Sequence, residues 1–135
     1  MYKFGETSIR RLCTVTKNLD SVCRRALSYG VMDATVIEGS RGAAEQDRYF
    51  AIGKSRVKWP NGKHNRLPSK AVDIAPYVNG AVSWNKNHCL VWAGLMLAAA
   101  AELGVTLRWG GNWDMDGEPI TDQEFQDLVH FEEAS

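Results

Sequence analysis

The sequence has few cysteines, and their positions exclude the usual special roles of that residue. Its three cysteines, Cys13, Cys23 and Cys89, form no C-x-x-C pair and match no common zinc or redox spacing. We therefore expect three reduced thiols that pack as small hydrophobic side chains. Reduced thiols suit a protein that folds in a reducing cytoplasm.

An excess of one charge sign is also missing. Lysine plus arginine total 16, aspartate plus glutamate total 16, and the formal net charge is zero. This balance argues against a protein that holds nucleic acid by bulk electrostatics. A loose basic patch near Trp59 is interpreted most simply as a solvated loop, with a substrate-steering surface or a nucleic-acid site as alternatives. The patch consists of Lys54, Arg56, Lys58, Lys63, Arg66 and Lys70.

No hydrophobic run is long enough to cross a bilayer. The longest apolar stretch covers residues 89–101, whereas a spanning helix needs about 20 residues. The opening residues, MYKFGETSIRRLC, have no apolar stretch after their charges and do not read as a signal peptide. We expect no stable membrane insertion, and a separate release route if the protein acts outside the cytoplasm.

What remains is the composition of an ordinary globular domain. The chain has 135 residues, of which 44% are hydrophobic, so we expect one domain over 1–135 with a real core. Apolar residues recur at helical spacing in two long segments, and β-rich stretches lie between glycine and proline signals. The predicted helices are 8–29 and 84–103, and the predicted strands are 34–40, 70–76 and 105–110.

Weaker signals complete the predicted fold. A further helix over 41–53 leads into a loop over 55–68, and Asn79-Gly80 marks a turn between two short extended pieces. The last segment, 123–133, is either a short helix or a strand, and its periodicity does not decide between them. Together these elements predict an α+β fold with two long helices packed on a small, largely antiparallel sheet.

Two of the three histidines have a carboxylate at a sequence spacing that could place both side chains in one site. His64 precedes Asp73 by nine positions in GKHNRLPSKAVDIAPY, and an unpaired carboxylate within the apolar AVDIAP run would be costly. His130 lies in DLVHFEE, three residues after Asp127 and two before Glu132. In a strand His130 and Glu132 would share a face, whereas in a helix Asp127 and His130 would share one.

These residue types suit metal-assisted hydrolysis. Two imidazoles and one carboxylate form a catalytic zinc set that leaves a position for water, whose pKa the ion lowers toward roughly 7. A further carboxylate must take the proton, and a cation must hold the oxyanion. Arg41, just after the predicted strand 34–40, is placed to be that cation. The plain alternative is two satisfied polar histidines in a small binding protein.

Longer stretches carry a family resemblance. EGSR, KHNRLPSKAVDIAPYVNGAVSWN and LRWGGNWDMDG followed by FQDLVHFE resemble the M15 family of zinc D,D-peptidases and L-alanyl-D-glutamate endopeptidases, which includes small bacteriophage endolysins. The resemblance implies a hedgehog-like peptidase fold with one Zn²⁺ per chain in a surface cleft. It implies zinc ligands at His64, Asp73 and His130, a catalytic carboxylate at Asp127 and an oxyanion-stabilising arginine at Arg41.

The chain departs from the broad S-x-H-x-x-G-x-A-x-D motif of that family. Gly62 replaces the serine, Ser69 stands at the glycine position, and the His-to-Asp interval is two residues longer. Because a loop can absorb two residues at little entropic cost, we expect both ligands to be kept. The resemblance also suggests that Trp109 and Trp113 line the cleft, although both suit aromatic packing in a core equally well.

The activity implied by the resemblance is that of a phage endolysin, which hydrolyses a stem-peptide amide bond of bacterial peptidoglycan, with L-alanyl-D-glutamate as the expected bond. The alternatives are a D-Ala-D-Ala carboxypeptidase and a non-catalytic wall-binding module with a structural zinc. The expected protein is a monomer that stays in the host cytoplasm until a holin assists its release to the periplasm and cell wall. A calcium ion on Asp114, Asp116 and Glu118 in DMDGE is a second metal prediction.

Overall fold

The structure is a computed structural model, and it describes residues 1–42, 48, 51–53, 59, 63–118 and 126–134. Most of the predicted helix over 41–53 and much of the predicted loop over 55–68 lie outside the described residues. Among the described residues, no helix combines the length and the apolar character needed to span a membrane.

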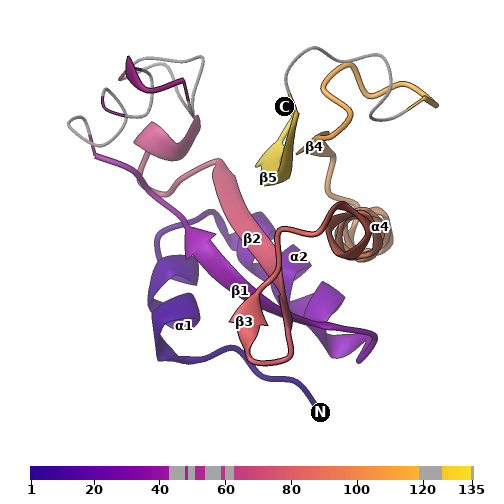
Figure 1. The fold of residues 1–135 in the computed structure, drawn as a ribbon. Helices are drawn as coiled ribbons and strands as arrows, with labels where there is room; N and C mark the ends of the chain where they lie inside the picture. The colour runs from indigo at the N-terminus through magenta and orange to yellow at the C-terminus, as the bar shows by residue number, and fades with distance from the viewer. Residues whose placement is uncertain (43–47, 49–50, 54–58, 60–62, 119–125, 135) are drawn as a thin grey trace.

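A five-stranded sheet carries the site (Figure 1). Strands β1 (Asp33–Glu38), β2 (Ala71–Val78), β5 (Asp127–Glu133) and β4 (Leu107–Gly110) lie side by side in that order, and β3 (Ala81–Val82) pairs with the far end of β2. All of these pairings are antiparallel. The first six residues of β2 are all buried, which explains why AVDIAP reads as a continuous apolar run.

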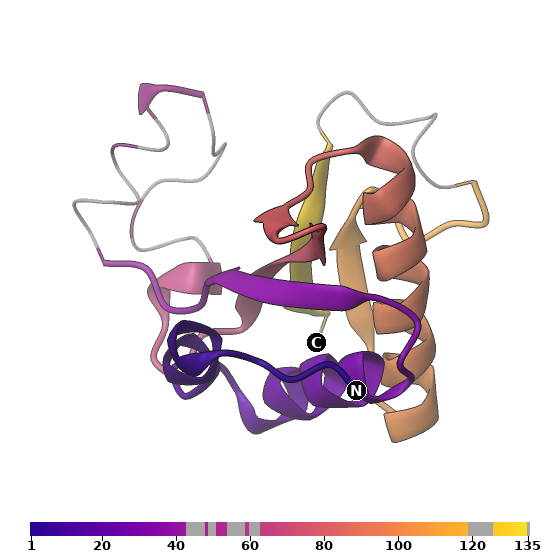
Figure 2. The ribbon, with the colours of Figure 1, turned by 60° about the horizontal axis from the view of Figure 1, so that its bottom comes forward.

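Helices cover this sheet. Figure 2 shows α2 (Lys17–Ser28) beside α4 (Lys86–Leu103), which stands against the sheet, and α1 (Glu6–Leu12) near one end of β1. The Asn85 side chain caps the start of α4, and Gly104 ends it with a left-handed φ of 73°. The predicted α+β architecture with an antiparallel sheet is confirmed, and so is the helix ended by Gly104.

The core lies between the helices and the sheet. Leu19 of α2, Trp92 and Met96 of α4 and Phe131 of β5 are each 1% exposed or less and belong to one apolar cluster. Because Phe131 neighbours His130 on β5, the packing of this core sets the position of the strand that carries the histidine.

The prediction of one continuous helix over 8–29 is wrong, because the helix is interrupted between α1 and α2. Thr16 caps α2, and its hydroxyl accepts a hydrogen bond from the backbone N–H of Leu19 at 3.3 Å. The backbone of the break pairs with Ser69: the Ser69 N–H donates to the Thr14 carbonyl at 2.7 Å, and the Thr16 N–H donates to the Ser69 carbonyl at 2.9 Å. Periodicity hides this break, since apolar residues on both sides of it face the same core.

The Asn79-Gly80 turn is confirmed, but Pro76 does not end the preceding strand as predicted. Asn79 and Gly80 have φ values of 53° and 81° and join β2 to β3. Strand β2 continues to Val78, and Pro76 lies between its β5-paired part and its β3-paired part. The Pro76 carbonyl accepts from the Ser83 N–H at 2.8 Å just past β3, and because proline has no N–H, the reciprocal hydrogen bond is not made.

The cysteines are free thiols, as expected. Cys23 and Cys89 are buried, but Cys13 is exposed. The prediction that all three pack as hydrophobic side chains is therefore wrong for Cys13, which lies at the C-terminal end of α1 where the helix breaks.

Candidate active site

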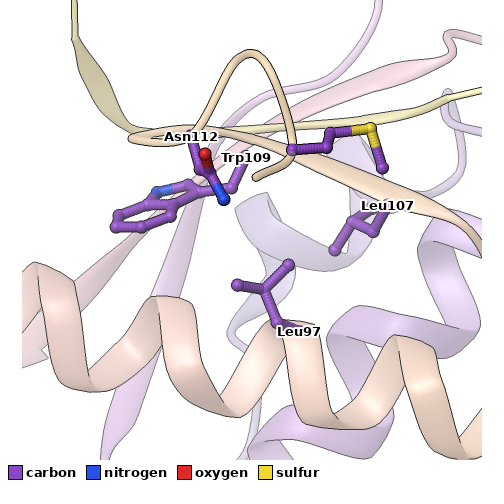
Figure 3. A pocket seen from close by; sticks show the side chains of 5 residues that line it. Leu97, Leu107, Trp109 and Asn112 are labelled. Atoms are coloured by element: carbon purple, nitrogen blue, oxygen red, sulfur yellow. The ribbon is translucent and has the colours of Figure 1, made fainter. Parts of the chain in front are cut away.

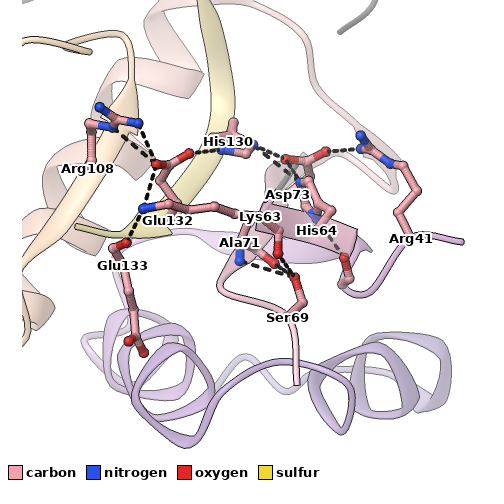
Figure 4. A network of polar contacts seen from close by, with 11 residues as sticks. Arg41, Lys63, His64, Ser69, Ala71, Asp73, Arg108, His130, Glu132 and Glu133 are labelled. Atoms are coloured by element: carbon pink, nitrogen blue, oxygen red, sulfur yellow. Dashed lines mark hydrogen bonds and ion pairs between the residues drawn. The ribbon is translucent and has the colours of Figure 1, made fainter. Parts of the chain in front are cut away.

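His64, Asp73 and His130 each point one ligand atom at a common position (Figure 4). His64 Nε2 lies 3.2 Å from Asp73 Oδ1 and 3.3 Å from His130 Nδ1, and the last two atoms lie 3.1 Å apart. His64 belongs to the short 3-10 turn η1 (Lys63–Asn65), whereas Asp73 and His130 face each other across β2 and β5. Among the described residues, this is the one group of three or more such side chains arranged to hold a metal ion.

The geometry of the three atoms fits a tetrahedral ion. Zinc bonds of roughly 2.0–2.1 Å at tetrahedral angles place neighbouring ligand atoms about 3.3 Å apart. The outer nitrogens are also fixed, since His64 Nδ1 lies 2.6 Å from the Gly39 carbonyl oxygen and His130 Nε2 lies 2.8 Å from Glu132 Oε1. With the outer nitrogens donating, the inner nitrogens present lone pairs, as metal ligation requires. The cluster can therefore bind a metal ion.

The longer interval between His64 and Asp73 does not separate them, because the intervening loop folds back on itself. The hydroxyl of Ser69 is buried and lies 2.7 Å from the Ala71 carbonyl oxygen and 3.2 Å from that of Lys63. Ser69 thus closes the loop at the position where the family motif has glycine.

Arg41 lies beside the cluster, as its place after a strand predicts. It follows β1, and its backbone N–H donates to the His64 carbonyl at 2.6 Å. Its Nη2 atom lies 2.9 Å from Glu38 Oε2 and 3.6 Å from Asp73 Oδ2. The guanidinium is therefore held at the edge of the cluster, on the side of Asp73 that faces away from the histidines.

The last segment is a strand, so His130 and Glu132 share a face. Glu132 is buried; its Oε2 atom lies 2.7 Å from Arg108 Nη2 and 3.1 Å from Lys63 Nζ. Burial alone would raise the pKa of Glu132, but the hydrogen bond and charge of His130, followed by hydrogen bonds from Arg108 and Lys63, lower it to about 2. Glu132 is therefore ionised and firmly held, which makes it unsuited to take up a proton near neutral pH.

Asp127 begins the same strand at a bulge. Trp109 pairs with Phe131 and Gly110 pairs with Asp127, so four steps along β5 lie opposite one step along β4. In a regular strand, residues three positions apart such as Asp127 and His130 point to opposite faces. The bulge interrupts this alternation. Gly110 permits it, because a Cβ there would overlap the carbonyl group of Asp127.

The surroundings of Asp127 favour proton transfer. Burial, with a smaller effect of the Asp73 charge, raises the pKa of Asp127 to about 6, against opposing effects of His130 and His64. A carboxyl group with such a pKa can accept and return a proton near neutral pH. Asp127 and Glu132 thus have pKa values displaced in opposite directions, the pattern by which a site separates a proton carrier from a fixed charge.

The cluster itself favours positive charge among its members. Burial alone would raise the pKa of Asp73, but the charge of His64 and hydrogen bonds from both histidines hold it well below its usual range. Burial alone would lower the pKa of His130, but its hydrogen bonds to Asp73 and Glu132 raise it to about 10. A metal cation supplies positive charge at the same place.

The two tryptophans suggested for the cleft separate in the structure. The ring of Trp113 lies 5.3 Å from that of His130, and the guanidinium carbon of Arg108 lies 5.4 Å from the Trp113 ring. Trp109 is buried in the core, and its indole N–H donates to the Leu128 carbonyl at 2.8 Å. The cleft suggestion is therefore wrong for Trp109, because β4 turns this side chain inward.

The predicted calcium residues lie on an exposed turn after β4. Asp114 Oδ1 accepts from the Asp116 backbone N–H at 3.3 Å, and Asp116 Oδ1 accepts from the Glu118 backbone N–H at 2.8 Å. These contacts shape the turn, and the calcium site stays a prediction.

A small pocket lies beside this turn, and Figure 3 shows the side chains that line it. Its volume is about 180 Å³, and it opens between α4 and the end of β4. Its lining is Leu97, Leu107, Trp109, Asn112 and Met115. Because none of the three ligand residues lines it, this pocket is separate from the candidate chemistry.

Sequence reasoning missed the roles of Lys63 and Arg108. Lys63 is assigned to the loose basic patch, yet its ammonium group turns to Glu132; of that patch, Lys54, Arg56 and Lys58 lie outside the described residues. Arg108 faces Glu132 across β4 and β5. Only the register of these strands, which the sequence does not state, would have revealed the pair.

Comparison with known proteins agrees with this geometry. The family model described as phage L-alanyl-D-glutamate peptidase matches residues 1–133. The L-alanyl-D-glutamate peptidase of Escherichia phage T5 is 37% identical over 119 residues, which cover 87% of this chain and 85% of that protein. The crystal structure of Serratia marcescens L-Ala D-Glu endopeptidase ChiX superposes with a TM-score of 0.81 at 28% identity, covering 99% of this chain and 90% of that one. The chain therefore belongs to the phage L-alanyl-D-glutamate peptidase family, and it is a peptidase of that family.

Proposed function

We propose that the protein is a zinc-dependent endolysin that hydrolyses the L-alanyl-D-glutamate bond in the stem peptide of bacterial peptidoglycan. The observation that carries this proposal is the convergence of His64 Nε2, Asp73 Oδ1 and His130 Nδ1 at 3.1–3.3 Å from one another. The choice of bond is supported by the names of the phage T5 and Serratia marcescens relatives.

The side chains divide the work of hydrolysis. His64, Asp73 and His130 would hold the zinc ion, which when bound lowers the pKa of a water molecule and polarises the scissile carbonyl. Asp127 takes the proton of the attacking water and returns it to the leaving amine, a role that its raised pKa supports. Arg41, beside Asp73, stabilises negative charge that develops on the carbonyl oxygen.

The main alternative activity uses the same residues on a different bond. A D-Ala-D-Ala carboxypeptidase would release D-alanine, whereas the proposed endopeptidase creates new N-terminal glutamate. Mass spectrometry of purified peptidoglycan after digestion separates the two products. New N-terminal glutamate supports the proposal, and release of D-alanine alone refutes it.

A non-catalytic wall-binding module is the alternative from another functional class. Wild-type protein should reduce the turbidity of outer-membrane-permeabilised Gram-negative cells, whereas Asp127→Ala should keep one zinc ion per chain and fail to lyse them. Glu102→Ala is the matched control, because Glu102 is an exposed carboxylate in the last turn of α4 that pairs with Arg25 of α2. If neither wild type nor Asp127→Ala lyses cells while both bind zinc and wall, the binding module replaces the peptidase proposal.

We further propose that the protein acts as a monomer and reaches the wall from the host cytoplasm with the help of a holin. Its membership of a phage peptidase family supports this route. Fractionation of host cells that make the protein with and without a holin tests the route, and light scattering of the purified protein tests the monomer.

A further inference from the structure

We propose that Glu132 is the positioning residue for both histidines of the metal centre: it orients the His130 ring directly and ties down the His64 turn through Lys63. The inference deepens the proposed function and rests on it. Its basis is a set of contacts around a single buried carboxylate, drawn in Figure 4.

The first contact fixes the ring of His130. Glu132 Oε1 lies 2.8 Å from His130 Nε2, on the side of the ring opposite the ligand atom Nδ1. An ionised carboxylate only accepts hydrogen bonds, so it keeps the proton of the neutral ring on Nε2 and leaves the lone pair on Nδ1. A carboxylate in this relation to a ligand histidine orients the ring and raises its basicity.

The other carboxylate oxygen is fully engaged by cations. Glu132 Oε2 lies 2.7 Å from Arg108 Nη2, 3.1 Å from Arg108 Nε and 3.1 Å from Lys63 Nζ. Two positive groups compensate the burial of one negative group, and they reach it from different elements, β4 and η1. The carboxylate cannot rotate without breaking these contacts, so Oε1 stays directed at His130.

Lys63 extends the effect to the second histidine. It is the residue before His64 in η1, and its ammonium group also donates to the Glu133 carbonyl at 2.6 Å. The turn that carries His64 is thereby attached to β5 at two neighbouring points. One carboxylate thus links the elements that carry both imidazole ligands.

The test compares Glu132→Gln with Glu133→Gln. Both substitutions remove one negative charge from adjacent positions of β5, but the Glu133 side chain contacts Thr16 instead of His130. Zinc affinity is measured by competition with a chelator, and ligand geometry by the visible absorption spectrum of the cobalt-substituted proteins. We expect Glu132→Gln to lose about 10–100-fold in zinc affinity and to shift the cobalt spectrum, whereas Glu133→Gln keeps wild-type values.

A second variant keeps the proposal testable if Glu132→Gln does not fold. Arg108→Gln leaves the carboxylate in place but removes two of its donors from a partly exposed side chain. It should shift zinc affinity and the cobalt spectrum in the same direction by a smaller amount. Wild-type affinity and spectrum in whichever of these variants folds would overturn the positioning role while leaving the peptidase proposal intact. Failure of the wild type to bind zinc or cleave peptidoglycan would overturn both.

Discussion

Asp127 and Glu132 lie five positions apart on β5, but their surroundings shift the pKa values of the two carboxyl groups in opposite directions. At the Glu132 end the strand pairs regularly on both sides, with Ala71 of β2 and Arg108 of β4 opposite Glu132. At the Asp127 end the pairing with β4 is broken by the bulge at Gly110. The regular end places Arg108 and Lys63 against the ionised Glu132. The irregular end holds Asp127, whose carboxyl group can change protonation near neutral pH.

This contrast distinguishes two acidic residues beside the same candidate metal site. The pKa of Glu132 is lowered to about 2 by donors that surround it, whereas burial raises the pKa of Asp127 to about 6. Regular β pairing surrounds Glu132 with donors, while beside the bulge the burial of Asp127 outweighs the charges of the two histidines and the hydrogen bond from the Val129 backbone.

The largest effect is expected for Asp127→Asn. The substitution keeps size but removes the group that carries the proton, so the rate of peptide-bond cleavage should fall about 10²–10⁴-fold. Zinc content should stay at one ion per chain, because Asp127 is not among the three converging ligand atoms. Single-turnover cleavage of purified muropeptides, followed by mass spectrometry, measures the rate. A cleavage rate close to wild type would remove Asp127 from the mechanism.

Gly110→Ala should distort the Asp127 end of β5 and leave the contacts of Glu132 unchanged. The added Cβ overlaps the Asp127 carbonyl, so we expect a loss of about 1–3 kcal/mol in the free energy of unfolding and a clear fall in cleavage rate. Gly94→Ala in α4 is the matched control, because its Cβ meets no atom within 4 Å. Urea titration and cleavage assays of both variants measure the effects. Equal behaviour of the two variants would show that the bulge does not need glycine.

The loss of peptidase activity at low pH should reflect protonation of Asp127. This group must be ionised to take a proton, so activity should rise with pH through its pKa, which is about 6 without a metal ion and lower beside a bound cation. Half-maximal activity is therefore expected at or below about pH 6, measured with zinc content checked at each pH. The residual activity of Asp127→Asn should lack this rise. The same rise in the variant would assign it to another group.

The smallest effect concerns the stability of the metal-free protein. Because the folded-state pKa of Asp127 is raised to about 6, the unfolded chain loses this proton first, so the cost to folding builds up from about pH 4 to about pH 6 and stays constant above that. At pH 7 metal-free Asp127→Asn should therefore be more stable than metal-free wild type by about 1–2 kcal/mol. Thermal unfolding at pH 7 and at pH 4 measures this, and the gain should shrink at pH 4. A less stable variant at pH 7 would show that the carboxylate is better compensated than its surroundings indicate.

The sequence predicts those features that repeat locally. Helical spacing predicts α4 with its glycine end, and Asn79-Gly80 predicts the hairpin, since both signals act within a few residues. The break between α1 and α2 is not predicted, because it depends on backbone hydrogen bonds with Ser69 far along the chain.

The candidate site shows the same division. The order of His64, Asp73 and His130, with the family resemblance, predicts residues that the structure does bring together. Strand geometry predicts that His130 and Glu132 share a face, but not that two cations meet behind Glu132. The bulge beside Asp127 is equally hidden, because it depends on how closely Gly110 approaches the neighbouring strand.

Gly39 joins the packing of the first helix to the orientation of His64, a residue of the candidate metal site. Its carbonyl oxygen accepts from His64 Nδ1, while a Cβ on the same residue would overlap Thr14 Oγ1 and the Arg11 carbonyl. Any side chain at this position would push the β1 end away from the helix and carry the carbonyl with it. A substitution at Gly39 would therefore disturb the hydrogen bond that orients the His64 ring, so the fold and the candidate site place a joint constraint on a residue that has no side chain.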